Sequence, residues 1–204
     1  MLDHVQFVTG TSRSWTHRDK IKTPSGEKWL TLSVHKAPMN TPINEIQLSN
    51  LVDWRVNNLN LLKQNYRSAP FYDEVFPYIV DLYDCTPQLL ADFNLRSIEL
   101  LMDLLDVRIP LVRSSTLQPV GSSNELLIDL LGKVGATHYL SGVGARDYMQ
   151  PEKFAQAGIE LVWQQFAHPV YPQQFGNFVP YLSSLDLLFN CGIKASRQIL
   201  RDTV

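Results

Sequence analysis

Strands and helices are predicted to alternate along the C-terminal half of the chain, and this order constrains the fold more than any other feature of the sequence. Short apolar runs typical of buried strands lie at 109–113, 137–140 and 159–166. Helices are expected between and after them, at 122–135, 151–158 and 184–192. Strands joined through helices favour parallel β-α-β units with right-handed crossovers. The sequence therefore predicts an α/β fold with a mostly parallel sheet, flanking helices and a β-α-β-α-β order in this half.

The N-terminal half predicts a different arrangement. Apolar and polar residues alternate at 29–34 and again at 44–48, which is typical of half-buried strands and predicts an N-terminal antiparallel β-pair. From about 52 to 106, apolar residues recur at helical spacing, so we expect a helical insertion there. The sequence contains no internal repeat and no low-complexity tract. We therefore expect residues 1–204 to form a single α/β domain that carries this insertion.

Composition narrows the class of protein and its partners. Hydrophobic residues make up 45% of the 204 residues, enough for a substantial core, and the formal charge of −2 creates no field that attracts nucleic acid. No apolar run approaches the roughly 20 residues of a membrane span, and the start resembles no secretory signal, so we expect a cytoplasmic protein. Cys85 and Cys191 are too few for a disulfide framework or a zinc cage, and both are expected to be buried thiols.

Polar side chains follow each of the three predicted strands of the C-terminal half. Because ligands bind outside the carboxyl ends of parallel strands, we expect these side chains to surround one cavity. They are Arg113, Ser114 and Ser115 after the first strand, Ser141, Gly142, Gly144, Arg146 and Asp147 after the second, and His168, Tyr171, Gln173, Gln174 and Asn177 after the third.

The residue types at these strand ends suggest specific roles. Arg113 and Arg146 are candidates for holding an anion bidentately, and Asp147 or His168 is the candidate general base. The two glycines after the second strand allow a ligand to approach the backbone N–H groups. An alternative interpretation is that 141–147 is an ordinary β-to-α turn and that His168, which precedes a proline, binds a loop backbone group.

Two further features allow alternative interpretations. A basic segment surrounds Trp15 and contains Arg13, His17, Arg18, Lys20 and Lys22. This segment either binds a phosphate or nucleotide, or is a solvated face with Trp15 packed beneath it. Asp186 lies three residues after Ser183, so we expect it to cap a helix. The sequence contains no P-loop, serine-hydrolase elbow, complete G-x-G-x-x-G or spaced metal ligands; no metal site is predicted, and the cofactor is left unassigned.

Five motifs, in order along nearly the whole chain, resemble the WbqC-like protein family. They are I-K-T-P-S-G-E-K-W-L-T (21–31), R-S-S-T-L (113–117), Y-L-S-G-V-G-A-R-D-Y (139–148), H-P-V-Y-P-Q (168–173) and S-L-D-L-L-F-N-C-G (184–192). The resemblance implies a bacterial protein of O-antigen or other surface-polysaccharide gene clusters. It also implies a transferase that places glycine, or another small acyl or aminoacyl group, on a sugar or nucleotide-sugar from an activated donor.

Two alternatives to this function stay open at this point. The α/β pattern, the basic segment and the arginines also suit a nucleotidyltransferase, and a non-catalytic component of a polysaccharide assembly complex is the third possibility. The resemblance further implies that family members carry an N-terminal strand and helix before the part that matches L-D-H-V-Q-F (2–7), and usually an acidic residue where this chain has His4. We expect this sequence to lack that N-terminal segment.

Overall fold

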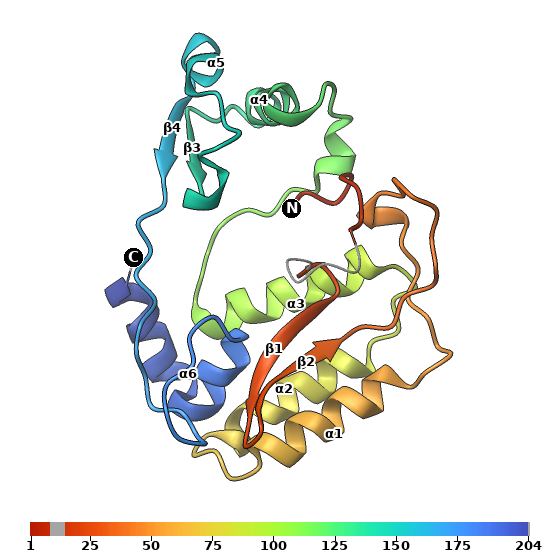
Figure 1. Ribbon diagram of the computed structural model, residues 1–204, viewed down its shortest axis with the longest axis vertical. Helices are drawn as coiled ribbons and strands as arrows, with labels where there is room; N and C mark the ends of the chain where they lie inside the picture. The colour runs from red at the N-terminus through yellow and green to blue at the C-terminus, as the bar shows by residue number, and fades with distance from the viewer. Residues whose placement is uncertain (9–14, 204) are drawn as a thin grey trace. The chain divides into compact units, whose positions relative to one another are not determined.

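The computed structural model describes residues 1–8 and 15–203, so Arg13 of the basic segment lies outside the described residues. Contacts divide the chain into two units. Unit 1 consists of Met1–His4 and Leu111–Ala167, and unit 2 consists of Val5–Pro110 and His168–Val204. Each unit combines helices with one pair of strands, so the chain is a mixed α/β protein (Figure 1). The single domain expected over 1–204 stays a prediction.

Unit 2 contains a β-hairpin formed by β1 (Arg18–Thr23) and β2 (Gly26–Thr31). A two-residue turn joins the strands, and Gly26 after it has a φ of +107°, a conformation that favours glycine. Ile21 and Leu30 are buried and belong to the core of unit 2. Arg18 and Lys20 of the basic segment lie on the other face of the hairpin, because successive side chains alternate along a strand.

The predicted N-terminal antiparallel pair is present, but its strands differ from the predicted ones. Residues 44–48 contribute the isolated bridge between Leu48 and Val34, next to the short 3-10 helix η1 (Ile43–Glu45). The partner of β2 is instead the charged stretch 18–23. A two-residue turn brings consecutive strands together with little loop-closure entropy, which favours this pairing over one across a longer connection.

Three helices fill most of the range 52–106, in which the sequence predicts helices. They are α1 (Trp54–Tyr66), α2 (Tyr72–Asp84) and α3 (Leu90–Leu105). α1 packs against β2 and α2, and its N-terminus is capped by Asp53, whose carboxylate accepts a hydrogen bond of 3.1 Å from Val56 N. The buried side chains of unit 2 form one core, which includes Ile21, Trp54, Leu62, Tyr66, Ile79, Leu90, Leu188 and Phe189.

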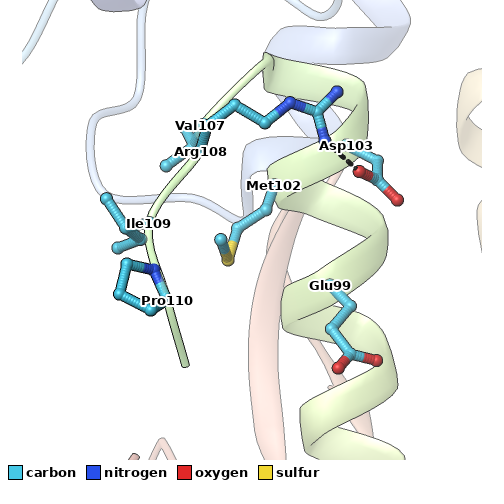
Figure 2. Close-up of a pocket in the computed structure, with 7 residues that line it drawn as sticks. All are labelled: Glu99, Met102, Asp103, Val107, Arg108, Ile109 and Pro110. Atoms are coloured by element: carbon cyan, nitrogen blue, oxygen red, sulfur yellow. Dashed lines mark hydrogen bonds and ion pairs between the residues drawn. The ribbon is translucent and has the colours of Figure 1, made fainter. Parts of the chain in front are cut away.

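A shallow pocket of about 560 Å³ lies beside the C-terminal end of α3 (Figure 2). Its lining consists of Glu99, Met102, Asp103, Val107, Arg108, Ile109 and Pro110. Figure 2 shows the chain after the helix running back alongside it, with the ion pair between Arg108 and Asp103 (2.6 Å) at one end. None of the residues predicted to bind a ligand lines this pocket.

The C-terminal helix of unit 2, α6 (Ser184–Thr203), is divided at Gly192. The backbone there has φ 76° and ψ 166°, outside the helical region, which confirms that the first helical stretch ends at Gly192. A Cβ atom at this position would lie 2.5 Å from Cδ1 of Phe71. Glycine is therefore required both by the backbone conformation and by the close approach of α6 to the start of α2.

Unit 1 contains the β-α-β order predicted after 122. The elements are α4 (Ser123–Lys133), β3 (His138–Ser141), α5 (Pro151–Gln156) and β4 (Glu160–Trp163). β3 and β4 are parallel, with His138 paired to Glu160 and Ser141 paired to Trp163. Phe154 of α5 is fully buried against this sheet together with Met149 and Ile159. The predicted parallel connection through a helix is confirmed for these two strands.

The first strand of the predicted parallel sheet, at 109–113, does not form. These residues are neither helix nor strand, and the 3-10 helix η2 (Ser114–Leu117) follows directly. Ile109 and Val112 are 59% and 42% exposed, and Pro110 has no backbone N–H to donate to a neighbouring strand. The described sheets therefore have two strands each, and a mostly parallel sheet is not formed. Within the described ranges, no helix combines the length and the apolar character needed to cross a bilayer.

Candidate functional site

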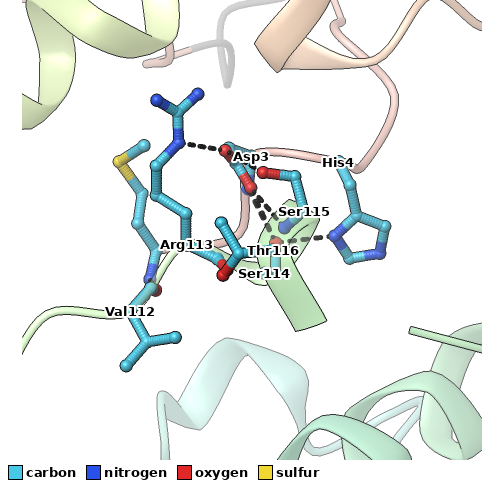
Figure 3. Close-up of polar contacts among 8 residues, drawn as sticks. Asp3, His4, Val112, Arg113, Ser114, Ser115 and Thr116 are labelled. Atoms are coloured by element: carbon cyan, nitrogen blue, oxygen red, sulfur yellow. Dashed lines mark hydrogen bonds and ion pairs between the residues drawn. The ribbon is translucent and has the colours of Figure 1, made fainter. Parts of the chain in front are cut away.

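The carboxylate of Asp3 is the centre of a buried polar cluster in unit 1 (Figure 3). Its side chain is 0% exposed and accepts hydrogen bonds from Arg113 Nε (2.7 Å), Ser115 Oγ (2.8 Å), Ser115 N (2.9 Å) and Ser114 Oγ (3.0 Å). Burial acts to raise the pKa of Asp3, but the hydrogen bonds led by Arg113 outweigh it and lower the pKa to about 2. Asp3 is therefore a charged residue that joins the N-terminal segment to the start of η2.

His4 extends this cluster. Its Nδ1 atom lies 2.6 Å from Ser114 Oγ, which also accepts a hydrogen bond of 3.0 Å from Asp3 N. The other ring nitrogen, Nε2, is buried and has no hydrogen-bond partner among the described residues. Ser114 is only 4% exposed, and its hydroxyl is held by Asp3 and His4.

The side chains that follow 109–113 and are predicted to bind a ligand thus donate hydrogen bonds to a carboxylate of the protein itself. Arg113, Ser114 and Ser115 all contact Asp3, a residue that sequence reasoning did not select. No local signal in the sequence links Asp3 to the R-S-S motif, because the partners are more than 100 positions apart in the chain. The role of these three residues towards a ligand stays a prediction.

The loop after β3 lies at the carboxyl end of the parallel pair. It contains the 3-10 helix η3 (Val143–Ala145), and a Cβ atom at Gly142 or Gly144 would meet nothing within 4 Å. The guanidinium carbon of Arg146 lies 5.3 Å from the ring centroid of Trp163, the last residue of β4. The carboxylate of Asp147 is exposed and has no interaction partner in the part of the chain that the structure describes. The loop therefore presents a guanidinium, a carboxylate and open backbone to solvent.

Asn124 of α4 holds the far end of this loop. Its side chain is buried and donates to Tyr148 O (3.1 Å), while its Oδ1 accepts from Gln150 N (3.1 Å). Ser141 at the near end is also buried, and its carbonyl accepts from Gln164 N (2.8 Å). Both ends of the loop are thus fixed by hydrogen bonds, and sequence reasoning missed Asn124 because its partners come from a different element.

His168 lies in unit 2, and both of its ring nitrogens contact backbone groups. Nδ1 donates to Pro169 O (2.8 Å), and Nε2 accepts from Tyr181 N (3.1 Å). These partners define the neutral tautomer with the proton on Nδ1. A general-base role, which stays a prediction, would require Tyr181 N to release Nε2.

A second buried carboxylate, Asp186, lies in unit 2. It is 1% exposed and accepts hydrogen bonds from Tyr66 Oη (2.7 Å), Gln173 Nε2 (2.8 Å) and Tyr171 Oη (3.1 Å). Lys22, which is 3% exposed, donates to Gln173 Oε1 (3.2 Å). The expectation that the Asp186 side chain caps a helix is wrong, because its oxygens are used by tyrosine and glutamine donors from distant segments.

The pKa values of Asp186, Tyr66 and Tyr171 are all raised in this cluster. Burial raises the pKa of Asp186 even though Tyr66, Tyr171 and Gln173 donate to its carboxylate. Burial, and then the charge of Asp186, raise the pKa values of Tyr66 and Tyr171. Both phenols therefore remain protonated donors, and three of the sequence motifs (21–31, 168–173 and 184–192) meet in this cluster.

The predicted site residues are thus distributed over both units. Unit 1 contains those at 113–115 and 141–147, and unit 2 contains His168, Tyr171 and Gln173. The single cavity expected around all three segments stays a prediction. Across residues 1–8 and 15–203, no group of three or more His, Cys, Asp or Glu side chains is placed to hold a metal ion.

Fold and clusters together define a mixed α/β protein with two buried carboxylate clusters and an exposed arginine-aspartate loop at a parallel strand end. The chain belongs to the WbqC-like protein family, which matches residues 1–198. It is 30% identical over 198 residues to the uncharacterized protein Rv1507c of Mycobacterium tuberculosis (strain ATCC 25618 / H37Rv), covering 96% of this chain and 84% of that protein. No solved structure matches the chain.

Proposed function

We propose that this protein is a transferase of bacterial surface-polysaccharide biosynthesis. It transfers glycine, or another small acyl or aminoacyl group, from an activated donor to a sugar or nucleotide-sugar. Membership of the WbqC-like family supports the polysaccharide context. The observation that carries the proposal is the exposed pair of Arg146 and Asp147 at the carboxyl end of the β3–β4 pair, where ligands bind in parallel α/β sheets.

Arg146 is the proposed anchor for an anionic group of the acceptor. Its position over the Trp163 ring limits the freedom of the side chain, so less conformational entropy is lost when its N–H groups bind a phosphate or carboxylate. Backbone N–H groups near Gly142 and Gly144 supply further donors, because no side chain occupies the space beside these glycines. A phosphate of a nucleotide-sugar fits this set of donors.

Asp147 is the proposed general base. Its carboxylate accepts the proton of an acceptor hydroxyl or amine while that oxygen or nitrogen forms a bond to the carbonyl carbon of the donor. The bond from that carbon to the leaving group then breaks, and the leaving group departs with the bonding electrons. An activated donor is required because ester or amide formation from a free carboxylate is uphill in water. The buried clusters of Asp3 and Asp186 position the segments around them and do not take part in this step.

Replacing Arg146 with alanine should weaken the binding of nucleotide-sugars. Loss of a charge-assisted hydrogen bond typically costs about 1.5–3 kcal/mol, which corresponds to a roughly 10- to 150-fold weaker Kd. Arg146→Lys should fall between alanine and wild type, because lysine keeps the charge and loses the planar fork. Isothermal titration calorimetry with UDP-glucose, UDP-N-acetylglucosamine and their dTDP equivalents measures these changes.

The matched control is Arg96→Ala, which removes an exposed arginine from α3 in unit 2. This variant should bind like the wild-type protein. If both alanine variants bind equally well, Arg146 does not anchor the ligand. If nucleoside triphosphates bind and nucleotide-sugars do not, the nucleotidyltransferase alternative replaces the proposal.

A further inference from the structure

One face of the β1–β2 hairpin gathers aromatic and charged side chains away from the core. Trp29 pairs with Lys20 across the hairpin, and Arg18 and Glu27 lie two residues away on the same face. Trp15 completes the group, because its ring lies 5.1 Å from that of Trp29 at an angle of 57°. We refer to these five residues as the indole face. It belongs to unit 2, whereas Arg146 belongs to unit 1, so the inference below goes beyond the proposed function and does not rest on it.

Cations lie over both indole rings of this face. The guanidinium carbon of Arg18 is 4.2 Å from the centroid of Trp29, and Lys20 Nζ is 5.2 Å from Trp29 and 5.8 Å from Trp15. Such contacts occur roughly once per 70–80 residues in proteins, whereas residues 15–29 contain three. A guanidinium carries five N–H donors in its plane, so stacking on an indole is compatible with further hydrogen bonds from that plane.

The indole face is not simply packed beneath the basic segment. Trp15 is 47% exposed, and Trp29 is partly exposed, whereas Trp54 of the core is 3% exposed. Lys20 forms an ion pair with Glu27 at the edge of the face. The face therefore offers a partly exposed aromatic surface beside the charged groups of Arg18, Lys20 and Glu27.

We propose that the indole face binds a nucleoside diphosphate. The base stacks on the exposed indole of Trp15, and the diphosphate accepts hydrogen bonds from Arg18 and Lys20. Stacking of a base on an aromatic side chain and pairing of its phosphate with arginine or lysine are the interactions that bind single nucleotides in nucleic-acid sites. These two interactions require the aromatic ring and the cations to be adjacent, as they are here.

The charge around the face favours one nucleotide over a polymer. A single strand of nucleic acid requires a longer electropositive track, whereas Glu27 lies on this face and the whole chain carries a formal charge of −2. A neutral sugar would stack on the indoles but would make no use of Arg18 and Lys20. The combination of ring and cations therefore selects a ligand with both a flat ring and an anionic group.

The test is a titration of the protein with UDP and with ADP, followed through the indole N–H signals in ¹H–¹⁵N spectra. The four tryptophans give four such signals, and that of Trp54, which is buried in the core of unit 2, serves as the internal control. The signals of Trp15 and Trp29 should shift, and that of Trp54 should not. Trp15→Ala should weaken binding by about ten-fold or more, because base stacking is worth about 1–3 kcal/mol.

Variants that change single charges on the same hairpin test whether Lys20 binds the phosphates. Glu27→Gln should tighten binding about two- to five-fold, because it frees Lys20 from its ion pair and removes a negative charge beside the phosphates. Lys20→Gln should weaken binding, whereas Lys28→Gln should not, although both remove one positive charge. Lys28 is exposed and follows Glu27 on β2, so it points to the opposite face of the hairpin.

Four outcomes would overturn the proposal. Inorganic pyrophosphate that binds as tightly as UDP would reveal an anion site without stacking. Maltotriose that produces the same shifts would reveal a platform for neutral sugars, and a thymidine oligonucleotide that binds more tightly than UDP would reveal a nucleic-acid surface. Unchanged Trp15 and Trp29 signals at millimolar UDP would show that the indole face binds no nucleotide.

Discussion

Replacing Asp186 with alanine should lower the free energy of unfolding of unit 2 by about 3–5 kcal/mol. The variant leaves the hydroxyls of Tyr66 and Tyr171 and the amide of Gln173 without their common acceptor, and each unsatisfied buried donor costs about 1–3 kcal/mol. It also removes the negative charge near the buried ammonium of Lys22. Urea denaturation followed by circular dichroism measures the change.

Asp186→Asn is the matched variant, because it keeps the volume and one acceptor oxygen. We expect a smaller loss than for alanine, and we expect the difference from wild type to depend on pH. The folded state raises the pKa of Asp186 above its usual 3.8, so the folded protein holds this proton more strongly than the unfolded chain. The stabilisation from this group is fully present below the unfolded pKa and is lost as the pH rises through the folded pKa.

Wild type should therefore gain stability relative to Asp186→Asn as the pH is lowered from neutral towards 4. A stability difference that stays constant or shrinks over this range would contradict the raised pKa. Equal unfolding free energies for wild type and Asp186→Ala would contradict the structural role of the cluster.

The second large effect is expected in unit 1, where Asp3→Ala should cost about 2–3 kcal/mol. The folded pKa of about 2 against an ordinary value of 3.8 corresponds to roughly 2.5 kcal/mol in favour of the charged form. The variant also leaves Ser115 N and the hydroxyls of Ser114 and Ser115 without an acceptor. The fluorescence of Trp163 in unit 1, measured in variants in which the other tryptophans are replaced by phenylalanine, reports this unfolding.

The pH dependence of Asp3 has the opposite sign to that of Asp186. Because its folded pKa is lowered, the stabilisation is present above 3.8 and is lost as the pH falls towards 2. Asp3→Asn should therefore lose its disadvantage against wild type in acid. If the gap between the two proteins is as large at pH 2 as at pH 6, the carboxylate is not held charged by Arg113 and its neighbours.

The pattern of apolar residues, glycines and helix caps in the sequence correctly predicted several helices and strands. The helix that ends at Gly192 and the parallel order of 138–141 and 160–163 are examples. The sequence pattern did not predict correctly in every case which segments become strands, because that depends on the partner each segment finds in the folded chain. The first strand of the hairpin is rich in charge and was interpreted as a basic surface segment, because only one of its faces contacts the core. Residues 109–113 have the composition of a strand, but they include Pro110 and pair with no strand among the described residues, and Ile109 and Val112 are exposed.

The candidate site shows the same division between local and tertiary information. The loop with Arg146 and Asp147 follows a glycine pattern that is visible in the sequence. The partners of Arg113 and Asp186 are not visible, because Asp3 lies 110 positions from Arg113 and Tyr66 lies 120 positions from Asp186. A buried carboxylate acquires its donors only in the folded chain, so residue type and spacing cannot distinguish it from a helix cap or a surface acid.

The most direct measurement of the proposed function is the mass of the surface-polysaccharide repeat unit in the organism that encodes this chain. Deletion of the gene should remove the mass of one glycyl, or other small acyl or aminoacyl, group from the repeat. The wild-type gene and an Arg96→Ala gene should restore that mass, and an Asp147→Asn gene should not, provided that the variant protein melts like wild type. An identical repeat mass in the deletion strain and its parent would contradict the proposed transfer.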